Sequence, residues 1–577
     1  MPQNARSFWK VLLSRQLRVG VLRRVSFTTF GLGDSSYPQY NVAHRMLHSR
    51  MLQLGAQLFC QRGEGNEQHP EGHTGEFRAW IVDLKESLLE HFPVPAGREI
   101  IGEDVFIQPK WFLKPADGSV ATTQLWKDCS KDAGGSLPAD RPPGDDLLPI
   151  KDAVTATLSA NTRLTPTAHH QDVRLLDFAM QEHIPYNPGA VAVVYPKNFP
   201  QDVNAFIDSQ SWQEVADAPI QILPTAEGVD LKRYPPSPLR NVEGNKKTFT
   251  LRELLTNYLD ILSIPRRSFF ASLAHFAKDG NEDEQYQKER ILELANPELI
   301  DELWDYTTRP RRTILEIMPD FTSIKIPWQY ALTILPIMRG RQFSIASGGE
   351  LKFDATGGTK VQLLVAIANP PNPIIKYRKR HGVCTRYIAQ LKAGSQLKIT
   401  IQPGYLNVKK EEIAVPVLMI GPGTGVAPMR SMIYERRAWA KELALDADAK
   451  DGGDCSGSVL FYGCRNEQAD YFFHEEWDNL SRQGLTVFAG FSRDKDKPKT
   501  YVQDLIRAQA HVVRDMLINR QGKIYVCGSS GNMPKGVRDA FVEVIREDAS
   551  MKNQSNDYIE GFVDQLEKEG RYKQETW

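Results

Sequence analysis

The chain shows no excess of charge of either sign, no long apolar run and no closely paired cysteines. Its 71 lysines and arginines balance 71 aspartates and glutamates, which disfavours a nucleic-acid coat or a polybasic membrane binder. No apolar run reaches the roughly 18 residues of a transmembrane helix, and the first residues lack the basic-then-apolar layout of a signal peptide. The six cysteines include no C-x-x-C pair, so neither a disulfide framework nor a metal site is predicted.

The residues that are present are typical of a multidomain enzyme. At 577 residues the chain has room for about four domains, and its 41% hydrophobic content argues against general disorder. Residues 1–92 alternate helix and strand patterns, and residues 93–149, rich in proline, glycine and aspartate, are interpreted as a linker. Strand patterns follow, interrupted by helical ones between about 249 and 318. No internal repeat is visible.

The N-terminal segment contains only two predicted strands. Its expected elements, in order, are a helix around Phe8–Leu17, a strand at Val25–Phe30, a helix at Tyr40–Leu54, a strand at Gln57–Cys60 and a helix at Phe77–Leu89. Two parallel strands cannot bury both faces of a sheet or supply a stable core. We therefore expect this segment to be an incomplete domain.

Strand and helix patterns alternate again toward the C-terminus. The predicted strands are Val415–Ile420, Val459–Tyr462, Leu485–Ala489 and Lys523–Cys527, each followed by a helical run, which favours a parallel sheet covered by helices. The first strand leads into Gly421–Pro428, where small residues would let a pyrophosphate approach the start of a helix. Taken alone, a plain tight turn fits these glycines about as well.

Two further stretches suggest binding of a phosphorylated ligand. Ser492, Arg493 and Lys499 offer a hydroxyl and two cations suited to an extra phosphate on a ribose, although a solvated basic loop has the same composition. Nearby, Tyr501 has a ring on which an adenine can stack. Gly382–Thr385 opens a predicted helix and is a second candidate anion site.

A third stretch suggests an aromatic ligand. Arg341–Ser347 joins a cation, an aromatic and a hydroxyl on one extended segment, with Arg341 and Phe343 on one face and Ser344 on the other.

These segments together resemble the diflavin reductase family, whose members include NADPH–cytochrome P450 reductase and the sulfite reductase flavoprotein. Three stretches are most similar to the NADPH-dependent reductases that serve cytosolic iron–sulfur cluster assembly: Tyr258–Ile261 with Pro265–Phe270, Arg309–Leu315 and the Phe343 region. The resemblance implies a multidomain α/β and α+β protein. Its expected parts are a partial flavodoxin-like (FMN) domain at 1–92, a linker at 93–149, an FAD-binding antiparallel β-barrel at 150–405 with a helical insert, and a parallel α/β NADP-binding domain at 406–577.

The resemblance also assigns roles to residues of this chain. FAD would be bound by Arg309, Arg341, Gln342, Phe343, Ser344, Gly382, Val383, Cys384, Thr385 and Trp577. NADPH would be bound by Thr424, Arg465, Ser492, Arg493, Lys499, Thr500, Tyr501, Val502 and Gln503. Hydride transfer would involve Ser344, Cys527, Glu575 and Trp577, the indole shielding the flavin until nicotinamide displaces it. Glu575 stands where relatives commonly have aspartate, and Phe343 where many have tyrosine.

The FMN site is expected to be incomplete. The family's FMN contacts correspond to Leu32, Gly33, Asp34, Ser35, Ser36, Tyr37, Pro38, Gln39, Tyr40, Asn41 and Glu67, with Tyr37 stacking on the ring. The Ser/Thr/Gly-rich loop that holds the FMN phosphate has no counterpart. A truncated gene model, an alternative start and a natural FMN-free variant each account for this. We expect NADPH-driven reduction of small acceptors such as ferricyanide and poor transfer to a protein.

The resemblance implies an anamorsin-like iron–sulfur protein as acceptor, no nucleic-acid or membrane partner, and a cytoplasmic location with the mitochondrion as a second. Two alternatives stay open. The chain is a member of the cytochrome P450 reductase or sulfite reductase branch, or it is a non-catalytic FAD-binding scaffold whose FMN domain is incomplete.

Overall fold

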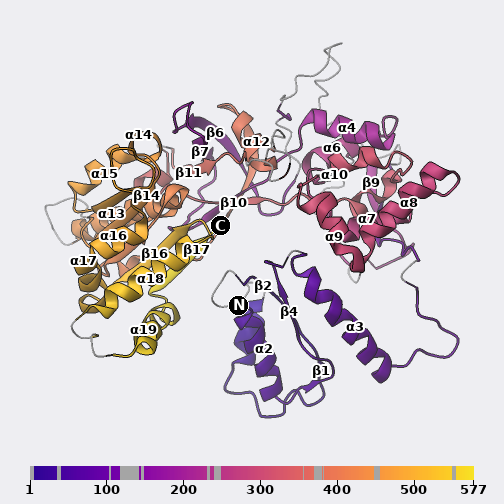
Figure 1. Cartoon of the computed structure of the whole chain (residues 1–577), viewed down its shortest axis with the longest axis horizontal. Helices are drawn as coiled ribbons and strands as arrows, with labels where there is room; N and C mark the ends of the chain where they lie inside the picture. Colours follow the sequence, from indigo (N-terminus) through magenta and orange to yellow (C-terminus); the bar gives the residue numbers. More distant parts are fainter. Residues whose placement is uncertain are drawn as a thin grey trace. The chain divides into compact units, whose positions relative to one another are not determined.

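The computed structural model describes the chain except for residues 1–4, 36–39, 70, 103–104, 117–141, 145–148, 231–233, 240–248, 355, 370–373, 375–379, 381, 447–454, 549–550 and 552–553. It divides into two compact units, Met1–Ile107 and Gln108–Trp577, and each is described by itself. Figure 1 follows the elements along the chain from indigo to yellow. Among the described residues, no helix combines the length and the apolar character needed to cross a bilayer.

The first unit is a small α/β assembly. Its elements are α1 (Arg6–Leu12), β1 (Ser26–Phe27), β2 (Phe30–Gly33), α2 (Val42–Gln53), β3 (Gln57–Leu58), β4 (Gly63–Asn66) and α3 (Thr74–His91). Strand β1 pairs with β3 and β2 pairs with β4, both in parallel. The prediction of two strands is therefore wrong, because four are present in the described part of this unit. The glycines of β2 and β4 lack side chains, so these strands show no alternating apolar pattern.

The second unit begins with a strand that lies inside the segment interpreted as a linker. Strand β5 (Trp111–Pro115) pairs antiparallel with β9 (Ile220–Pro224), and Leu113 is fully buried. The linker interpretation is therefore wrong for these residues, which belong to the second unit. Their prolines and lysines obscure the strand pattern, and their partner lies more than a hundred residues away.

A six-stranded antiparallel sheet forms the barrel part of this unit. Its strands run in the order β10-β8-β12-β6-β7-β11. They are β6 (Val154–Arg163), β7 (Val173–Met180), β8 (Val191–Val194), β10 (Arg341–Ser344), β11 (Thr359–Ala366) and β12 (Gln396–Gln402). Helix α12 (Val383–Gln390) packs its buried face, Cys384, Tyr387 and Ile388, into the same apolar core as the strands. This packing fixes the helix against the barrel.

A helical segment is inserted between β8 and β10. It contains α4 (Pro200–Gln210), α6 (Leu251–Asn257), α7 (Arg267–Ala274), α8 (Glu282–Ala295), η2 (Pro297–Leu299), α9 (Ile300–Leu303), η3 (Trp304–Thr308), α10 (Ile314–Ile317), η4 (Met318–Asp320), η5 (Trp328–Tyr330) and α11 (Ala331–Ile334). The helices α6 to α10 lie where helical patterns are predicted, whereas α4 and α11 extend beyond that range. Their buried faces share one apolar core with β5 and β9.

The C-terminal part is a five-stranded parallel sheet in the order β15-β14-β13-β16-β17. Its strands are β13 (Val417–Ile420), β14 (Ser458–Cys464), β15 (Thr486–Phe491), β16 (Lys523–Gly528) and β17 (Tyr572–Thr576). The helices are η7 (Lys410–Glu412), η8 (Gly423–Gly425), α13 (Val426–Asp446), α14 (Glu467–Asp470), α15 (His474–Ser481), α16 (Val502–Ala508), α17 (Ala510–Arg514), η9 (Asp515–Asn519), α18 (Met533–Arg546) and α19 (Asn556–Lys568), while the short helix η6 (Gly349–Lys352) connects β10 with β11.

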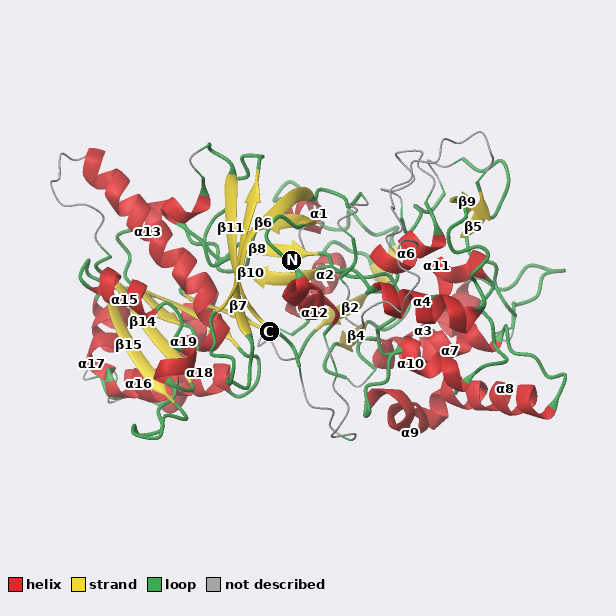
Figure 2. Ribbon diagram, turned by 90° about the horizontal axis from the view of Figure 1, so that it is seen from above, coloured by secondary structure: helices red, strands yellow, loops and turns green. Residues whose placement is uncertain are grey.

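Helices cover both faces of this sheet. Alternate residues of β13 enter different apolar cores: Val417 and Met419 pack with α13 and α15, whereas Leu418 and Ile420 pack with α16 and α18. Figure 2 shows the yellow strands between α13 on one side and α16 and α18 on the other. The four predicted strands are confirmed, and β17 is an additional strand at the edge.

Candidate active site

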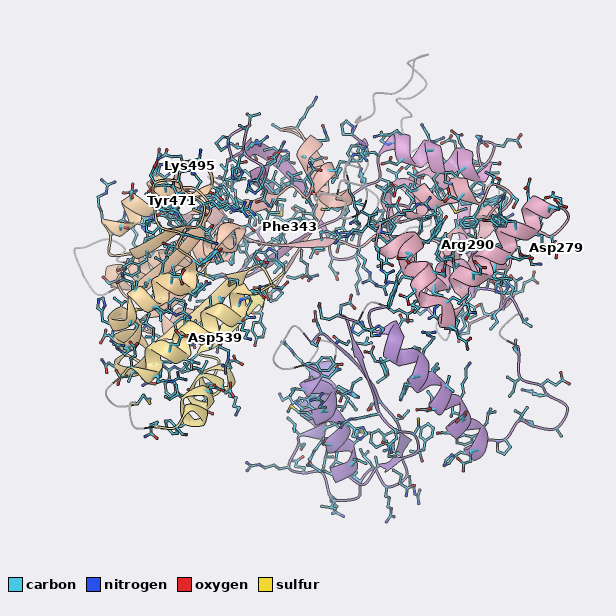
Figure 3. The ribbon with its side chains drawn as sticks, viewed as in Figure 1. Asp279, Arg290, Phe343, Tyr471, Lys495 and Asp539 are labelled. Atoms are coloured by element: carbon cyan, nitrogen blue, oxygen red, sulfur yellow. The ribbon has the colours of Figure 1, made fainter. Side chains whose placement is uncertain are left out.

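Strand β10 carries the cation and the aromatic ring predicted to contact FAD. Phe343 is partly buried against the barrel core, and Figure 3 places it where β10 runs between the barrel and the helical segment. Arg341 Nη2 lies 3.6 Å from Oδ2 of Asp260, a buried residue. Burial raises the pKa of Asp260, and the charge of Arg341 opposes that rise. Asp260 lies in the stretch Tyr258–Ile261, but its partner is evident only in the fold.

The start of α12 offers backbone N–H groups to an anion. Gly382 is the N-cap, and the Oγ1 of Thr385 accepts a hydrogen bond from the Ala368 N–H at 3.0 Å. A Cβ at Gly382 would lie 2.8 Å from Thr385 Oγ1 and 3.0 Å from Ala368 Cβ, so a larger residue there must displace one of these side chains. The N–H groups of the first turn have no helical acceptor, which suits a diphosphate. Burial raises the pKa of the Cys384 thiol to about 12, so it stays neutral.

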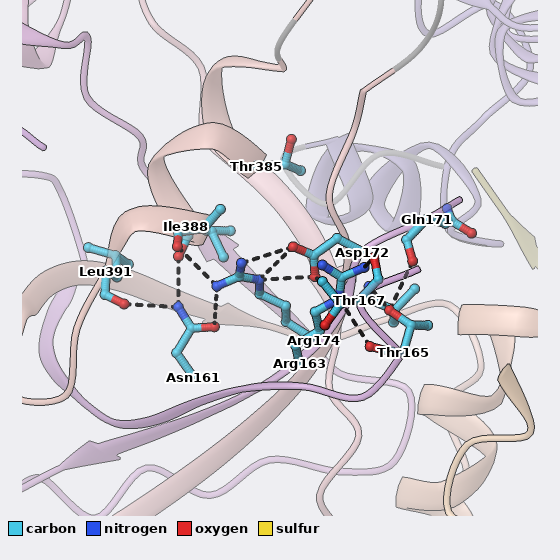
Figure 4. Close-up of polar contacts among 12 residues, drawn as sticks. Asn161, Arg163, Thr165, Thr167, Gln171, Asp172, Arg174, Thr385, Ile388 and Leu391 are labelled. Atoms are coloured by element: carbon cyan, nitrogen blue, oxygen red, sulfur yellow. Dashed lines mark hydrogen bonds and ion pairs between the residues drawn. The ribbon is translucent and has the colours of Figure 1, made fainter. Parts of the chain in front are cut away.

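The opposite end of α12 is held by two side chains of the barrel strands (Figure 4). Asn161 Nδ2 donates to the carbonyl oxygens of Ile388 at 3.0 Å and Leu391 at 2.9 Å. Arg174 Nη1 donates to the Ala389 carbonyl oxygen at 3.0 Å and to Asn161 Oδ1 at 3.3 Å. These contacts satisfy carbonyl groups at a helix C-terminus, where a cation is also favoured. Sequence reasoning missed both residues because α12 is more than two hundred residues away from them.

Arg309 and Gln342, like Trp577, are exposed, whereas the other described FAD residues are at least partly buried. Arg309 follows η3, and its described partners are two carboxylates of its own helical segment, Asp305 and, at 3.2 Å, Asp301. Gln342 is exposed on β10. Both side chains are therefore accessible to a ligand from solvent.

The glycine-rich turn after β13 lies directly against the end of β16. A Cβ at Gly425 would lie 2.2 Å from the carbonyl oxygen of Cys527, and Gly423 has a left-handed φ of 56°. Thr424 lies between these glycines in η8. The missing side chains leave the backbone open to a pyrophosphate and allow α13 to start close to the sheet.

The candidate ribose-phosphate residues gather at the carboxyl ends of β14 and β15. Ser492 N donates to the Cys464 carbonyl oxygen at 3.0 Å, and Arg493 N donates to that of Arg465 at 2.8 Å. The backbone thus places Arg465, Ser492 and Arg493 side by side. The Lys499 Nζ lies 5.2 Å from the centroid of the Tyr501 ring, which is 43% exposed and has room for a stacked base.

The remaining predicted NADPH residues differ in accessibility. Val502 is buried, and a Cβ at Gly463 would lie 2.8 Å from its Cγ1, so its side chain belongs to the core. Thr500 N donates to the Phe491 carbonyl oxygen at 3.0 Å, and the side chain of Gln503 lies next to Gly536.

A histidine from the barrel joins the same cluster. His170, between β6 and β7, has its Nε2 in contact with Nη1 of Arg465. Desolvation is the largest cause that lowers the pKa of His170, followed by the charge of Arg465. The neutral imidazole therefore accepts a hydrogen bond from the guanidinium. No sequence pattern links these two residues, which lie 295 positions apart.

The C-terminal strand brings three predicted catalytic residues together. In the parallel pairing of β16 and β17, Cys527 lies opposite Glu575, and Trp577 N donates to the Gly528 carbonyl oxygen at 3.0 Å. Glu575 Oε2 is buried without a hydrogen-bond partner, and burial raises the pKa of this carboxyl to about 7. Burial, followed by the charge of Glu575, raises the pKa of the Cys527 thiol well above its ordinary value. The Trp577 side chain is 51% exposed.

Ser344, the fourth predicted catalytic residue, ends β10. The residues directly after it pack against α13, whose first turn follows Thr424. The flavin strand and the nucleotide-binding turn are thus connected through one packed segment. Described histidine, cysteine and acidic side chains form no group that would hold a metal ion.

In the first unit, two loops carry the predicted FMN contacts. Ser35 N donates to Asn66 Oδ1 at 3.0 Å, and Gln68 Nε2 donates to Asp34 Oδ1 at 2.9 Å. Glu67 pairs with His73 at 2.8 Å. These bonds join the loops after β2 and β4.

The other predicted FMN residues flank these loops. Leu32 is exposed on β2, and Gly33 accepts a hydrogen bond from the His73 ring at 2.8 Å through its carbonyl oxygen. Tyr40 and Asn41 donate to carbonyl oxygens of β4. Ser36, Tyr37, Pro38 and Gln39 lie outside the described residues.

The polar groups gathered in the second unit fit the two expected nucleotides, FAD and NADPH. The glycine cradles at Gly382 and Gly425 suit phosphates, and the cations around Arg493 suit an additional phosphate. The unpartnered oxygen of Glu575, close to an exposed indole, suits a planar ring with a polar edge.

Comparison with known proteins gives matches along the chain. Family models match for flavodoxin at residues 1–80, for an FAD-binding domain at 149–387 and for an oxidoreductase NAD-binding domain at 419–539. The NADPH-dependent diflavin oxidoreductase 1 of Aspergillus fumigatus is 44% identical over 584 residues, which cover 100% of this chain and 88% of that protein. The proteins of the same name from Emericella nidulans and Xenopus laevis are 44% and 32% identical, over 100% of this chain and 88% and 89% of theirs. The predicted fold class is confirmed.

Proposed function

The chain belongs to the NADPH-dependent diflavin oxidoreductases, and from that premise we propose that its second unit transfers a hydride from NADPH to FAD at the residues described above. The chain is an NADPH-dependent flavoprotein oxidoreductase with flavodoxin, FAD-binding and NAD-binding domains. The individual roles of its residues and the final acceptor are parts of the proposal.

FAD would be held by β10 and α12. The N–H groups after Gly382 and the guanidinium of Arg341 bind the diphosphate, while Phe343 packs on the ring system. Because Arg341 also faces the buried Asp260, its side chain is held in place before the ligand arrives. Phe343 stacks as a tyrosine would but offers no phenolic hydrogen bond.

NADPH would be held by the turn after β13 and by the ends of β14 and β15. The N–H groups near Thr424 receive the pyrophosphate, and Arg465, Ser492, Arg493 and Lys499 surround the ribose phosphate. Tyr501 stacks on the adenine. A cofactor that lacks the additional phosphate leaves these cations without a counter-charge, which accounts for selection of NADPH over NADH.

Once bound, these two cofactors supply the hydride chemistry themselves, and the chain supplies orientation, shielding and a proton-holding group. Below pH about 7, Glu575 is a neutral acid whose unpartnered oxygen can donate or accept a hydrogen bond. Cys527 remains a neutral thiol beside it, so it does not act as a nucleophile. Trp577 keeps water from the ring face until it moves aside.

The observation that carries this assignment is the pairing of β16 with β17. It places Cys527, Glu575 and Trp577 at the carboxyl-terminal end of the sheet, where the turn at Gly425 also lies. The test is anaerobic titration of the purified chain with NADPH. We expect a yellow protein that contains FAD and loses its flavin absorbance. A colourless chain that takes up no added FAD would contradict the assignment and would favour the non-catalytic scaffold.

For the acceptor, we propose an anamorsin-like iron–sulfur protein of cytosolic cluster assembly, and a location in the cytoplasm with the mitochondrion as a second. The support is the likeness of Tyr258–Ile261, Pro265–Phe270 and Arg309–Leu315 to the reductases of that pathway. The measurement mixes the purified iron–sulfur protein with NADPH and this chain. The absorbance of the iron–sulfur protein then reports how fast it is reduced. Faster reduction of cytochrome P450 under the same conditions would favour the other branch.

A further inference from the structure

The segment that follows β10 is fastened to α13 by a buried arginine. The side chain of Arg430 is 3% exposed, and its Nη1 donates to the Ala346 carbonyl oxygen at 2.9 Å and to Gln362 Oε1 at 2.8 Å. Its Nε and Nη2 donate to the Glu476 carboxylate at 2.7 and 3.0 Å. The guanidinium therefore connects the barrel, through Ala346 and Gln362, with two helices of the parallel-sheet domain.

Two more side chains of α13 hold the same segment. Ser431 Oγ donates to the Ser347 carbonyl oxygen at 2.7 Å. Glu435 accepts hydrogen bonds from Gly349 N at 2.7 Å and from Lys352 Nζ at 3.0 Å. Ser431 and Glu435 are both buried, so these bonds are shielded from water.

The glycines of this segment show how closely it lies against the helix. A Cβ at Gly348 would lie 2.0 Å from the Ser431 carbonyl oxygen, and one at Gly349 would lie 2.4 Å from that of Tyr434. Both obstructing atoms belong to the backbone of α13, so no side chain can rotate away to make room. A methyl group at position 348 must displace the segment or the helix.

We propose that Arg430, Ser431, Glu435 and Gly348 are positioning residues for hydride transfer. They fix the end of β10, where the flavin would lie, relative to α13, whose first turn would hold the NADPH pyrophosphate. The two cofactor-binding elements are then held in place relative to each other by the fold before either cofactor binds. This inference rests on the proposed function of β10 and of the turn at Thr424. Hydride transfer is sensitive to such placement because the rate falls steeply when reacting atoms shift by about 1 Å.

The test compares Gly348→Ala with Gly561→Ala. Gly561 lies on α19, and a Cβ there meets nothing within 4 Å, so this variant is the matched control. In stopped-flow experiments, we expect Gly348→Ala to slow flavin reduction by NADPH by about tenfold to a hundredfold. FAD content and affinity for 2′,5′-ADP, which reports the nucleotide site alone, should stay within about twofold of the parent chain. The control should match the parent in all three.

A second variant and a second measurement make the test decisive. Glu435→Gln keeps an acceptor for Gly349 N but loses the charge that faces Lys352, so it should slow flavin reduction less than Gly348→Ala. Hydrogen exchange on the chain without cofactors should show faster exchange at residues 345–352 in Gly348→Ala and no change there in Gly561→Ala.

Two outcomes would overturn the inference: an unchanged rate of flavin reduction in Gly348→Ala, or losses of FAD content and 2′,5′-ADP binding as large as the loss of rate. If NADPH fails to reduce the flavin of the parent chain, the proposed function is wrong instead. Unchanged exchange at 345–352 in Gly348→Ala would still overturn the inference, because that measurement needs neither cofactor.

Discussion

Glu575 is the residue whose chemistry the fold changes most clearly. A glutamate in a polar C-terminal stretch is ordinarily ionised and exposed. Here β17 places it opposite Cys527, burial raises its pKa from 4.5 to about 7, and one oxygen lacks a partner. The likeness to the diflavin reductases indicates that this residue matters, whereas its ionisation follows from packing.

This shift predicts a pH dependence of stability. An acid whose pKa is higher in the folded state destabilises the fold as pH rises through the window from 4.5 to about 7. Glu575→Gln removes the ionisable group. Above pH 7 the free energy of unfolding of this variant should therefore exceed that of the parent chain by on the order of 3 kcal/mol. Below pH 4.5 the difference should vanish.

Urea unfolding of the second unit at several pH values measures the difference. Glu560→Gln, on the exposed face of α19, is the control and should show no such trend. A constant difference between Glu575→Gln and the parent chain across the pH range would contradict the prediction.

The cations around Arg493 give the second prediction at this scale. Replacing Ser492, Arg493 and Lys499 together by alanine should lower kcat/KM for NADPH by about a hundredfold, because charge-assisted hydrogen bonds to the ribose phosphate are lost. The kcat/KM for NADH should stay within about threefold of that of the parent chain. Lys495→Ala, on the same exposed loop and labelled in Figure 3, is the control. An unchanged preference for NADPH in the triple variant would show that this cluster does not bind the phosphate.

At the scale of elements, α12 depends on contacts at the end away from its ligand. Asn161 and Arg174 satisfy its last carbonyl groups, so the orientation of the N–H groups after Gly382 follows from β6 and β7. Asn161→Leu removes the two hydrogen bonds to α12 and the one from Arg174, and Asn161→Asp places a carboxylate against carbonyl oxygens. We expect both variants to weaken FAD binding by about tenfold, Asn161→Asp more strongly.

Flavin fluorescence on titration of the flavin-free chain gives the dissociation constant. Thr167→Ala, an exposed residue of the same β6–β7 connection, is the control. Equal FAD affinity in the parent and both Asn161 variants would show that the start of α12 is positioned by other contacts.

Elements differ in how well the sequence predicts them, for physical reasons. Strands β13, β14 and β16 are buried on both faces and therefore appear as continuous apolar runs, which the sequence makes plain. Strand β17 lies at the edge with one fully buried residue, Tyr572, and β5 begins in a proline-rich stretch, so neither has such a run. The contacts of His170 and Asn161 depend on distant segments that no local pattern reveals.

At the scale of the whole molecule, the candidate sites divide between the two compact units. The residues proposed for FAD and NADPH all lie in Gln108–Trp577, whereas the loops with predicted FMN contacts lie in Met1–Ile107. Hydride transfer and onward electron transfer should therefore be separable by deletion. The sequence indicates this division through the proline- and glycine-rich stretch, but the boundary at residue 107 comes from the fold.

A chain of residues 108–577 should keep NADPH-dependent ferricyanide reduction within about twofold of the full chain, because that reaction needs only the second unit. Ferricyanide takes electrons directly from the flavin of this unit. We propose that a protein acceptor receives its electrons through FMN in the first unit, so its reduction should fall below detection in the shortened chain. Loss of ferricyanide reduction on deletion would show that the hydride site extends into the first unit.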